Sequence, residues 1–261
     1  MALTFATLAE IAQRRVLLGL GAYWDPLAWK QGIERRRPVA QMREYVAVTK
    51  RLLSLETVTF EGDLVQVRDL RLELGFGVPE VPIEVPIYLG ATGPKMLQLA
   101  GQVADGVLLN GFTSLVYQAE ALDHIASAAA EVGRSLDDLD LPQTVVVSMH
   151  DYVEQATETA RKATAMYLGQ QPHIARASGI EPDLLEAVAK ALGGWSPSEN
   201  GIDRAARLVP DEVVHALTVT GTPQEYKDQV ARYVTRNNIY PAILPISETF
   251  DEMVEVFAPD P

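Results

Sequence analysis

The chain has 261 residues, of which 48% are hydrophobic and 22% are charged, a composition typical of a globular protein. Its net charge of −13 argues against nucleic acid or an anionic membrane surface as a partner, because phosphate binding needs a basic surface. The absence of cysteine excludes disulfides, thiolate catalysis, iron–sulfur clusters and cysteine-ligated zinc.

Neither a membrane span nor a secretory leader is expected from the sequence. No apolar run reaches the ~18 residues that a transmembrane helix needs. Met1–Arg14 has no basic region followed by a small-residue cleavage site. We therefore expect a cytoplasmic protein.

Strand-like and helix-like patterns alternate along the chain. Five short apolar runs have the length of buried strands: Val16–Gly19, Val85–Leu89, Val107–Leu109, Thr144–Met149 and Ala242–Ile246. Apolar residues at helical spacing predict helices over Leu3–Gln13, Pro38–Leu55, Leu115–Val132, Tyr152–Leu168, Leu184–Leu192, Asp211–Leu217, Thr222–Arg236 and Thr249–Phe257. Alternating residues predict a β-hairpin over Val58–Leu74, and loops are expected over Tyr23–Arg37, Phe76–Pro82 and Gly193–Gly201.

Two of the predicted helices carry specific features. Leu3–Gln13 has apolar residues at Leu3, Leu8, Ile11 and Ala12, which predict the buried face of an amphipathic helix. Thr222-Pro223-Gln224-Glu225 has the pattern of a capping box with proline at the first helical position, so a helix is expected to begin there.

The stretch Val85–Thr113 is the centre of the chain. It predicts a strand, the glycine turn Gly90–Gly93, a helix that begins at Pro94 and ends near Gly101–Ala104, and a second strand. A strand, a crossover helix and a strand form a right-handed unit with parallel strands. The carboxyl ends of both strands, Gly90–Gly93 and Asn110–Thr113, are then expected at the edge where parallel α/β folds bind ligands.

Both strand ends have groups suited to a ligand. Gly93 either adopts a positive φ or lets a ligand approach the backbone, and the amides of a glycine turn that opens a helix bind anions. Asn110 and Thr113 would add side-chain donors. The alternative is a tight turn without a ligand.

The remaining candidates are weaker. The four histidines, His124, His150, His173 and His215, are scattered, so no metal site is predicted. His150 follows a predicted strand and is expected at the rim as a hydrogen-bonded side chain.

Other residues near strand ends have two interpretations each. Tyr23, Trp24 and Glu248 could line a pocket, although rim packing is the simpler interpretation. The run Arg35-Arg36-Arg37 indicates either a solvated rim or capture of an acidic cofactor tail.

The segment GATGPKMLQLAGQVADGVLLN resembles the luciferase-like family of flavin- and deazaflavin-dependent oxidoreductases. The resemblance is closest to the branch that contains methylenetetrahydromethanopterin reductase. There, a strand ending in Gly-Ala-x-Gly-Pro precedes a Met-Leu helix, Ala-Gly, Asp-Gly and a strand ending in Asn. Val16–Asp25 is similar to the fourth barrel strand of the same family.

This resemblance implies an α/β fold of the TIM (β/α)8-barrel type, as a single domain over residues 1–261. A closed barrel has eight strands, whereas about five strand–helix units are recognised here. Because Val16–Gly19 matches the fourth strand, the first three units are expected to be missing. An open parallel sheet leaves edges and an apolar face exposed, so we expect a homo-oligomer, as a dimer.

The resemblance also implies an activity and a cofactor. We expect an oxidoreductase that uses the deazaflavin coenzyme F420 for hydride transfer to or from a small organic substrate. The expected cofactor contacts are Gly90, Ala91, Thr92, Gly93, Asn110, Gly111 and Thr113. No catalytic residue is predicted. The alternatives are an FMN-dependent monooxygenase of the same fold and a non-catalytic remnant of such an enzyme.

Overall fold

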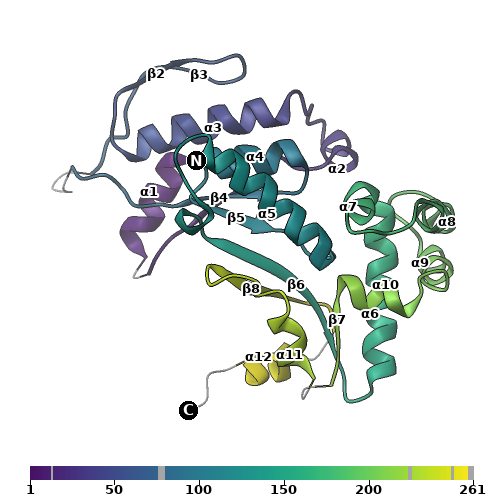
Figure 1. Ribbon diagram of the computed structural model, residues 1–261. Coiled ribbons are helices and arrows are strands. Elements are labelled where there is room, and N and C mark those ends of the chain that lie inside the picture. Colours follow the sequence, from purple (N-terminus) through teal and green to yellow (C-terminus); the bar gives the residue numbers. More distant parts are fainter. Residues whose placement is uncertain (13, 76–79, 223–224, 248–249, 258–261) are drawn as a thin grey trace. The chain divides into compact units, whose positions relative to one another are not determined.

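The computed structural model describes residues 1–12, 14–75, 80–222, 225–247 and 250–257 (Figure 1). The chain folds into two compact units. Residues 1–107 and 124–140 form the first unit, and residues 108–123 and 141–261 form the second. The expectation of one domain over the whole chain stays a prediction.

The first unit contains a parallel strand pair with helices and an antiparallel hairpin. Its elements are α1 (Ala2–Ile11), β1 (Leu18–Gly21), α2 (Asp25–Lys30), α3 (Pro38–Leu53), β2 (Val58–Glu61), β3 (Gln66–Leu70), β4 (Ile87–Ala91), α4 (Pro94–Val103) and a 3₁₀ turn over Leu136–Asp138. Strand β5 (Gly106–Leu109) and helix α5 (Leu115–Ala130) each have residues in both units.

Strands β1 and β4 pair in parallel, with Leu18 opposite Ile87 and Gly21 opposite Gly90. Helix α3 packs beside α4 (Figure 1). Asp105 ties three elements of this unit together, because one carboxylate oxygen accepts a hydrogen bond from Lys50 Nζ of α3 at 2.6 Å and the other accepts the Ile87 N–H at 2.8 Å. The start of β5 is thereby fixed beside the start of β4.

The predicted hairpin is present as β2 and β3, which pair antiparallel. Its turn is fastened to α3 by Glu44, whose carboxylate accepts the backbone N–H groups of Asp63, Leu64 and Val65 at 3.1, 2.9 and 2.7 Å. These three charge-assisted bonds explain why a two-stranded ribbon keeps a defined place within the first unit.

The second unit is built around strand β6 (Leu141–Met149). Its other elements are α6 (Val153–Gln170), α7 (Pro172–Ala177), α8 (Pro182–Leu192), α9 (Glu199–Ala206), α10 (Asp211–Leu217), β7 (Val219–Gly221), α11 (Tyr226–Ala231), β8 (Ile239–Pro245) and α12 (Phe250–Phe257). The end of β5, all of β8 and the short β7 each pair with β6 in parallel. Eight of its nine residues are buried, as expected for a strand covered on both faces.

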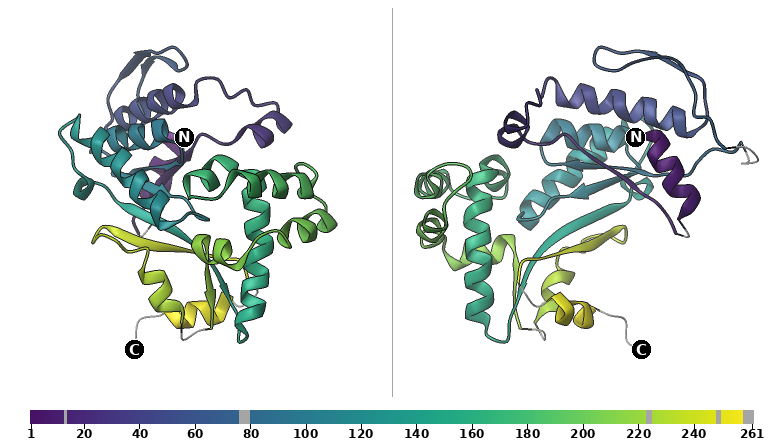
Figure 2. Two further views of the ribbon diagram at one scale, coloured as in Figure 1. Left: turned by 45° about the vertical axis from the view of Figure 1, so that its right-hand side comes forward. Right: turned by 180° about the vertical axis from the view of Figure 1, so that it is seen from behind.

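Two hydrophobic clusters stabilise the second unit. Val145, Val147 and Met149 of β6 pack against Tyr226 of α11 and Met253 of α12. Helices α6 to α10 share a separate cluster, and Figure 2 shows α7 to α10 gathered around the long α6.

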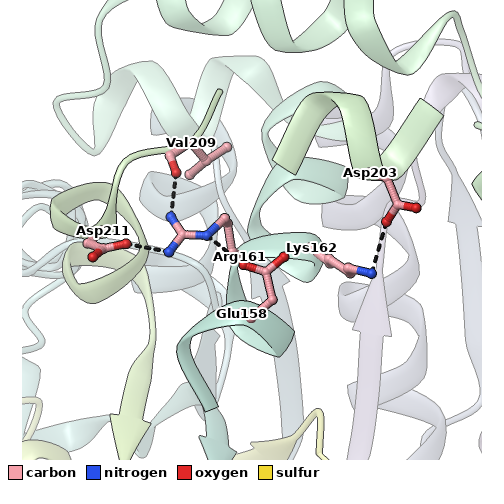
Figure 3. Close-up of polar contacts among 6 residues, drawn as sticks. All are labelled: Glu158, Arg161, Lys162, Asp203, Val209 and Asp211. Atoms are coloured by element: carbon pink, nitrogen blue, oxygen red, sulfur yellow. Dashed lines mark hydrogen bonds and ion pairs between the residues drawn. The ribbon is translucent and has the colours of Figure 1, made fainter. Parts of the chain in front are cut away.

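Ion pairs on α6 add to this bundle (Figure 3). Arg161 donates to Glu158, to Asp211 and to the carbonyl of Val209, and Lys162 pairs with Asp203 of α9 at 2.9 Å. Arg161 thereby links α6 to the start of α10.

Several predicted elements are confirmed and others are corrected. Helices α3, α4, α5, α6, α8, α10 and α12 and the hairpin lie where the pattern predicts them, within a few residues. The structure adds α2 within the expected loop Tyr23–Arg37, α7, the parallel strand β7, and α9, which begins in the last part of the expected loop Gly193–Gly201 and continues to Ala206. None of the strand pairs in the described residues closes a barrel.

The buried face of α1 differs from the prediction. Ala2 and Ala6 are the buried residues, whereas Leu3 and Ile11 are 59% and 70% exposed. Small alanines allow α1 to lie close to α3, which leaves the larger side chains outside.

The predicted helix start at Thr222 is also corrected. Pro223 and Gln224 lie outside the described residues, and α11 begins at Tyr226. The Glu225 carboxylate does accept hydrogen bonds from the N–H and the hydroxyl of Thr222, each at 3.1 Å. The first and last residues of the predicted capping box are thus hydrogen-bonded to each other just before the helix.

Candidate functional site

Glycines line the carboxyl ends of β1 and β4 in the first unit. Gly21 and Gly90 are partners in the strand register, and Gly93 follows as the N-cap of α4. A Cβ atom placed on Gly21 or Gly93 would meet no atom within 4 Å, and at Gly90 the nearest atom would be the Leu20 carbonyl oxygen at 3.8 Å. The backbone is therefore open to direct approach at this edge.

Gly93 does not use the conformational freedom that glycine offers. Its φ of −93° and ψ of 154° are extended values that any residue adopts, so the first of the two expected uses of glycine, a positive φ, is not found. The second predicted reason for a glycine here, close approach of a ligand, agrees with the empty space beside it.

The N-terminus of α4 suits an anion. Pro94 occupies the first turn, no side chain caps the helix, and the first turn contains no acidic residue. The positive end of the helix dipole is thus not neutralised from within the helix. Thr92 is half-buried beside it, whereas Ala91 is 2% exposed and is the least accessible of the four predicted residues.

A cleft of about 520 Å³ opens at the end of β1 in the same unit. Its lining includes Leu20, Gly21, Tyr23, Arg35, Met42 and Tyr45. Tyr23 thus lines a pocket, as one of its two interpretations had it, while its hydroxyl accepts a hydrogen bond from Gln31 Nε2 at 2.6 Å. Trp24 is the N-cap of α2, and Glu248 lies outside the described residues.

The run Arg35–Arg37 is neutralised by carboxylates. Arg35 pairs with Asp25 at 2.7 Å, Arg36 with Glu34, and Arg37 with Asp63 at 2.7 Å. The three guanidinium groups therefore have separate acidic partners. This favours the interpretation of the run as a solvated rim over capture of an acidic cofactor tail.

The turn after β5, residues 110–113 in the second unit, is held by internal hydrogen bonds. The carbonyl oxygen of Asn110 accepts the hydroxyl of Thr113 at 2.9 Å and Nε2 of Gln143 at 2.8 Å. The side-chain Nδ2 of Asn110 donates to the Gly111 carbonyl at 3.1 Å and to the Tyr167 hydroxyl. The donors that the sequence offered to a ligand are thus used within the protein.

Thr113 and Gly111 have packing roles here. Thr113 is 2% exposed, so its hydroxyl faces the turn. A Cβ on Gly111 would lie 2.8 Å from Cγ2 of Val146, so only glycine fits beside β6.

Two residues around this turn, Tyr167 and Gln143, were not predicted. Tyr167 of α6 stacks its ring on Phe112, with centroids 4.6 Å apart, and binds Asn110. Gln143 is buried in β6, and a lone amide within an apolar strand was the one available signal. The sequence contained no sign of the role of Tyr167, because an aromatic residue in an amphipathic helix is normally part of the hydrophobic core.

His150 lies at the rim, as expected. Its Nδ1 accepts the Tyr152 N–H at 3.1 Å, and the two rings are 5.8 Å apart. In the part of the chain that the structure describes, no group of three His, Asp or Glu side chains is placed to hold a metal ion. No helix among the described residues is long and apolar enough to cross a membrane.

Comparison with known proteins assigns the family. The family model for luciferase-like monooxygenases matches residues 1–237. The chain is 31% identical over 232 residues to the 5,10-methylenetetrahydromethanopterin reductase of Archaeoglobus fulgidus, covering 86% of this chain and 65% of the relative. It is 32% identical over 242 residues to the F420-dependent glucose-6-phosphate dehydrogenase of Beutenbergia cavernae, covering 90% and 64%. The chain thus spans about two thirds of the length of these relatives.

A solved structure supports the same fold. The F420-dependent tetrahydromethanopterin reductase of Methanopyrus kandleri superposes with a TM-score of 0.82 at 24% identity, covering 98% of this chain and 76% of that one. The predicted α/β fold of the TIM-barrel type is thereby confirmed. The chain belongs to the luciferase-like monooxygenase family.

Proposed function

We propose that this chain is an oxidoreductase that uses coenzyme F420 for hydride transfer to or from a small organic substrate. Three relatives that match over most of this chain carry names of an F420-dependent enzyme or of methylenetetrahydromethanopterin reductases. The observation that carries the proposal is the open glycine edge of Gly21, Gly90 and Gly93, which leads into the uncapped α4.

This edge fits the phosphate part of the cofactor. A side chain at Gly93 would fill the space next to the first turn of α4, and glycine leaves it empty. Gly90, Ala91, Thr92 and Gly93 are therefore proposed to bind the cofactor mainly through backbone groups. When bound, the deazaflavin supplies hydride chemistry, and the protein positions and desolvates it.

We also propose a second set of cofactor contacts, which lies in the second unit: Asn110, Gly111 and Thr113. Their support is the family resemblance of the strand end together with the rigid turn. Gly111 and Thr113 would also shape the turn, since both are buried.

The FMN-dependent alternative has weaker support. A monooxygenase from Streptomyces bottropensis superposes with a TM-score of 0.61 at 19% identity, which supports the fold alone. We further propose that the protein is cytoplasmic and forms a homo-oligomer, in the form of a dimer.

Hydride transfer is tested by following the absorbance of the oxidised deazaflavin. One assay mixes the protein with F420 and glucose 6-phosphate, and a second mixes it with reduced F420 and methylenetetrahydromethanopterin. A loss of absorbance in the first assay or a gain in the second supports the proposal. No change in both, together with oxygen uptake from reduced FMN that is faster than its spontaneous oxidation in a mixture without the protein, would replace it with the monooxygenase alternative.

A further inference from the structure

The amide of Asn110 is oriented by two neighbours. The Gly111 carbonyl only accepts hydrogen bonds, so the side-chain atom 3.1 Å from it must be the nitrogen Nδ2. The same Nδ2 also donates to the Tyr167 hydroxyl. Both protons of the amide nitrogen are therefore used.

The amide oxygen Oδ1 of Asn110 is the part of this side chain that remains available for a hydrogen bond. Within the described residues, no hydrogen bond to Oδ1 of Asn110 is found, and the oxygen is not among the buried side-chain atoms that lack a partner. Asn110 as a whole is half-buried. Its Oδ1 thus presents an accessible acceptor at the carboxyl end of β5.

Tyr167 also stabilises an unusual backbone conformation in this turn. Phe112 has a φ of +53°, which is rare for a bulky side chain and persists only where the surroundings enforce it. The ring of Tyr167 stacks on Phe112 with an interplanar angle of 20°. Burial raises the pKa of the Tyr167 hydroxyl, so this group stays protonated at working pH.

The other side of the turn is fixed independently by β6. Gln143 binds the Asn110 carbonyl, and its own Oε1 accepts Nε2 of Gln118 at 3.1 Å. Gln118 in turn donates to the Tyr233 carbonyl at 2.9 Å. The strand thus holds the backbone of Asn110, while Tyr167 holds its side chain.

We propose that Tyr167 is a positioning residue that orients Asn110 as a hydrogen-bond acceptor for a hydroxyl or N–H of the bound ligand. A phosphate oxygen is excluded at this position, because it would face Oδ1 without a proton between them. This inference rests on the proposed function, because the ligand is taken to be F420. It corrects the expectation that Asn110 serves as a donor.

A double-mutant cycle on the full chain tests the coupling. Tyr167→Phe keeps the stacked ring and removes the hydroxyl, and Asn110→Ala removes the acceptor. If Tyr167 acts through Asn110, each single variant weakens F420 binding about 5- to 10-fold, and the double variant is no weaker than Asn110→Ala. The control is Tyr152→Phe, an exposed tyrosine just before the same helix, which leaves the affinity unchanged.

Additive losses for Tyr167→Phe and Asn110→Ala would overturn the proposal, as would unchanged affinity in Tyr167→Phe. Each outcome would show that the hydroxyl does not act through the amide. Thermal melts separate these results from loss of fold, since Tyr167→Phe retains the stack on Phe112.

Nuclear magnetic resonance of the Asn110 side-chain amide tests the orientation without any cofactor. Slow exchange of both Nδ2 protons is expected in the wild type, with one proton exposed in Tyr167→Phe. Addition of inorganic phosphate is expected to leave the Asn110 side-chain resonances unchanged, and a phosphate-induced shift would contradict the acceptor role. If the wild type binds no F420, the proposed function fails, while these resonances still decide the role of Tyr167.

Discussion

Gly93 is the residue on which the proposed phosphate contact depends most. Its extended backbone accepts any side chain, and a Cβ there meets no atom within 4 Å. Asp and Asn are both good N-caps, so either substitution keeps α4 intact. The two variants therefore differ at this site in charge alone.

We predict that Gly93→Asp lowers F420 affinity by about tenfold or more relative to Gly93→Asn, because a carboxylate repels phosphate at the helix N-terminus. Titration of both variants measures the difference, and thermal melts are expected to match or exceed the wild type. Equal F420 affinity of the two variants would show that the cofactor phosphate does not bind at this turn.

The sequence predicted the local structure around this turn. The Gly-Ala-Thr-Gly-Pro turn was located correctly because glycine and proline restrict the backbone locally. The role of Asn110 was not predictable, since its partners, Gln143 and Tyr167, lie 33 and 57 residues away in the chain. Side-chain pairing across such separations depends on the fold.

At the scale of elements, the close approach of α4 and α5 depends on Gly101. A Cβ on Gly101 would lie 2.4 Å from the Ile125 carbonyl oxygen of α5. Alanine normally favours a helix interior over glycine by about 1 kcal/mol. Here the clash involves backbone that cannot rotate away, so overpacking outweighs the propensity.

We predict that Gly101→Ala lowers the free energy of unfolding by about 2 kcal/mol, seen as a lower Tm of about 4–8 °C. Gly19→Ala is the matched control, because a Cβ there meets nothing within 4 Å. If Gly101→Ala is as stable as the wild type, the helices are farther apart than described.

The link between α6 and α10 predicts a pH effect (Figure 3). The hydrogen bond from Arg161, together with its charge, lowers the pKa of Asp211. A carboxyl with a lowered pKa stabilises the fold above its ordinary pKa, about 3.9, and this stabilisation is lost as the pH falls through the folded value.

The stability difference between wild type and Arg161→Met is therefore expected to shrink as the pH falls below about 4. A part that is independent of pH remains, because Arg161 also binds the Val209 carbonyl at 2.6 Å. Denaturant unfolding between neutral pH and pH 3 measures the difference, with Lys190→Met on the exposed face of α8 as control. A difference that is constant or grows toward low pH would contradict this account.

The elements that sequence reasoning found share a physical cause. Helices α3 and α10 have a proline or acidic start and an apolar face long enough to define a period. Among the missed elements, α2, α7 and β7 have six, six and three residues, whereas α9 has eight. Segments this short form because the fold packs them, and their own sequences contain too little pattern.

At the scale of the whole molecule, α1 presents an apolar face. Leu3, Leu8 and Ile11 are exposed on it, although their spacing predicts burial. Exposed apolar residues gathered on one helix mark an interaction surface. We expect this face to be covered in the proposed homo-oligomer.

Light scattering after size exclusion is predicted to give a dimer for the wild type and a larger monomer fraction for Leu3→Glu combined with Ile11→Glu. Val132→Glu, at an exposed apolar position outside α1, serves as control and is expected to stay dimeric. A wild type that is monomeric at all concentrations would contradict the oligomer.

The most direct test of the account is equilibrium titration of the purified full chain with F420 and, in parallel, with FMN, followed by cofactor absorbance. The account predicts saturable binding of one F420 per chain, at least about tenfold tighter than FMN. Tighter binding of FMN, or no saturable binding of F420, would contradict the assignment of this chain as an F420-dependent oxidoreductase.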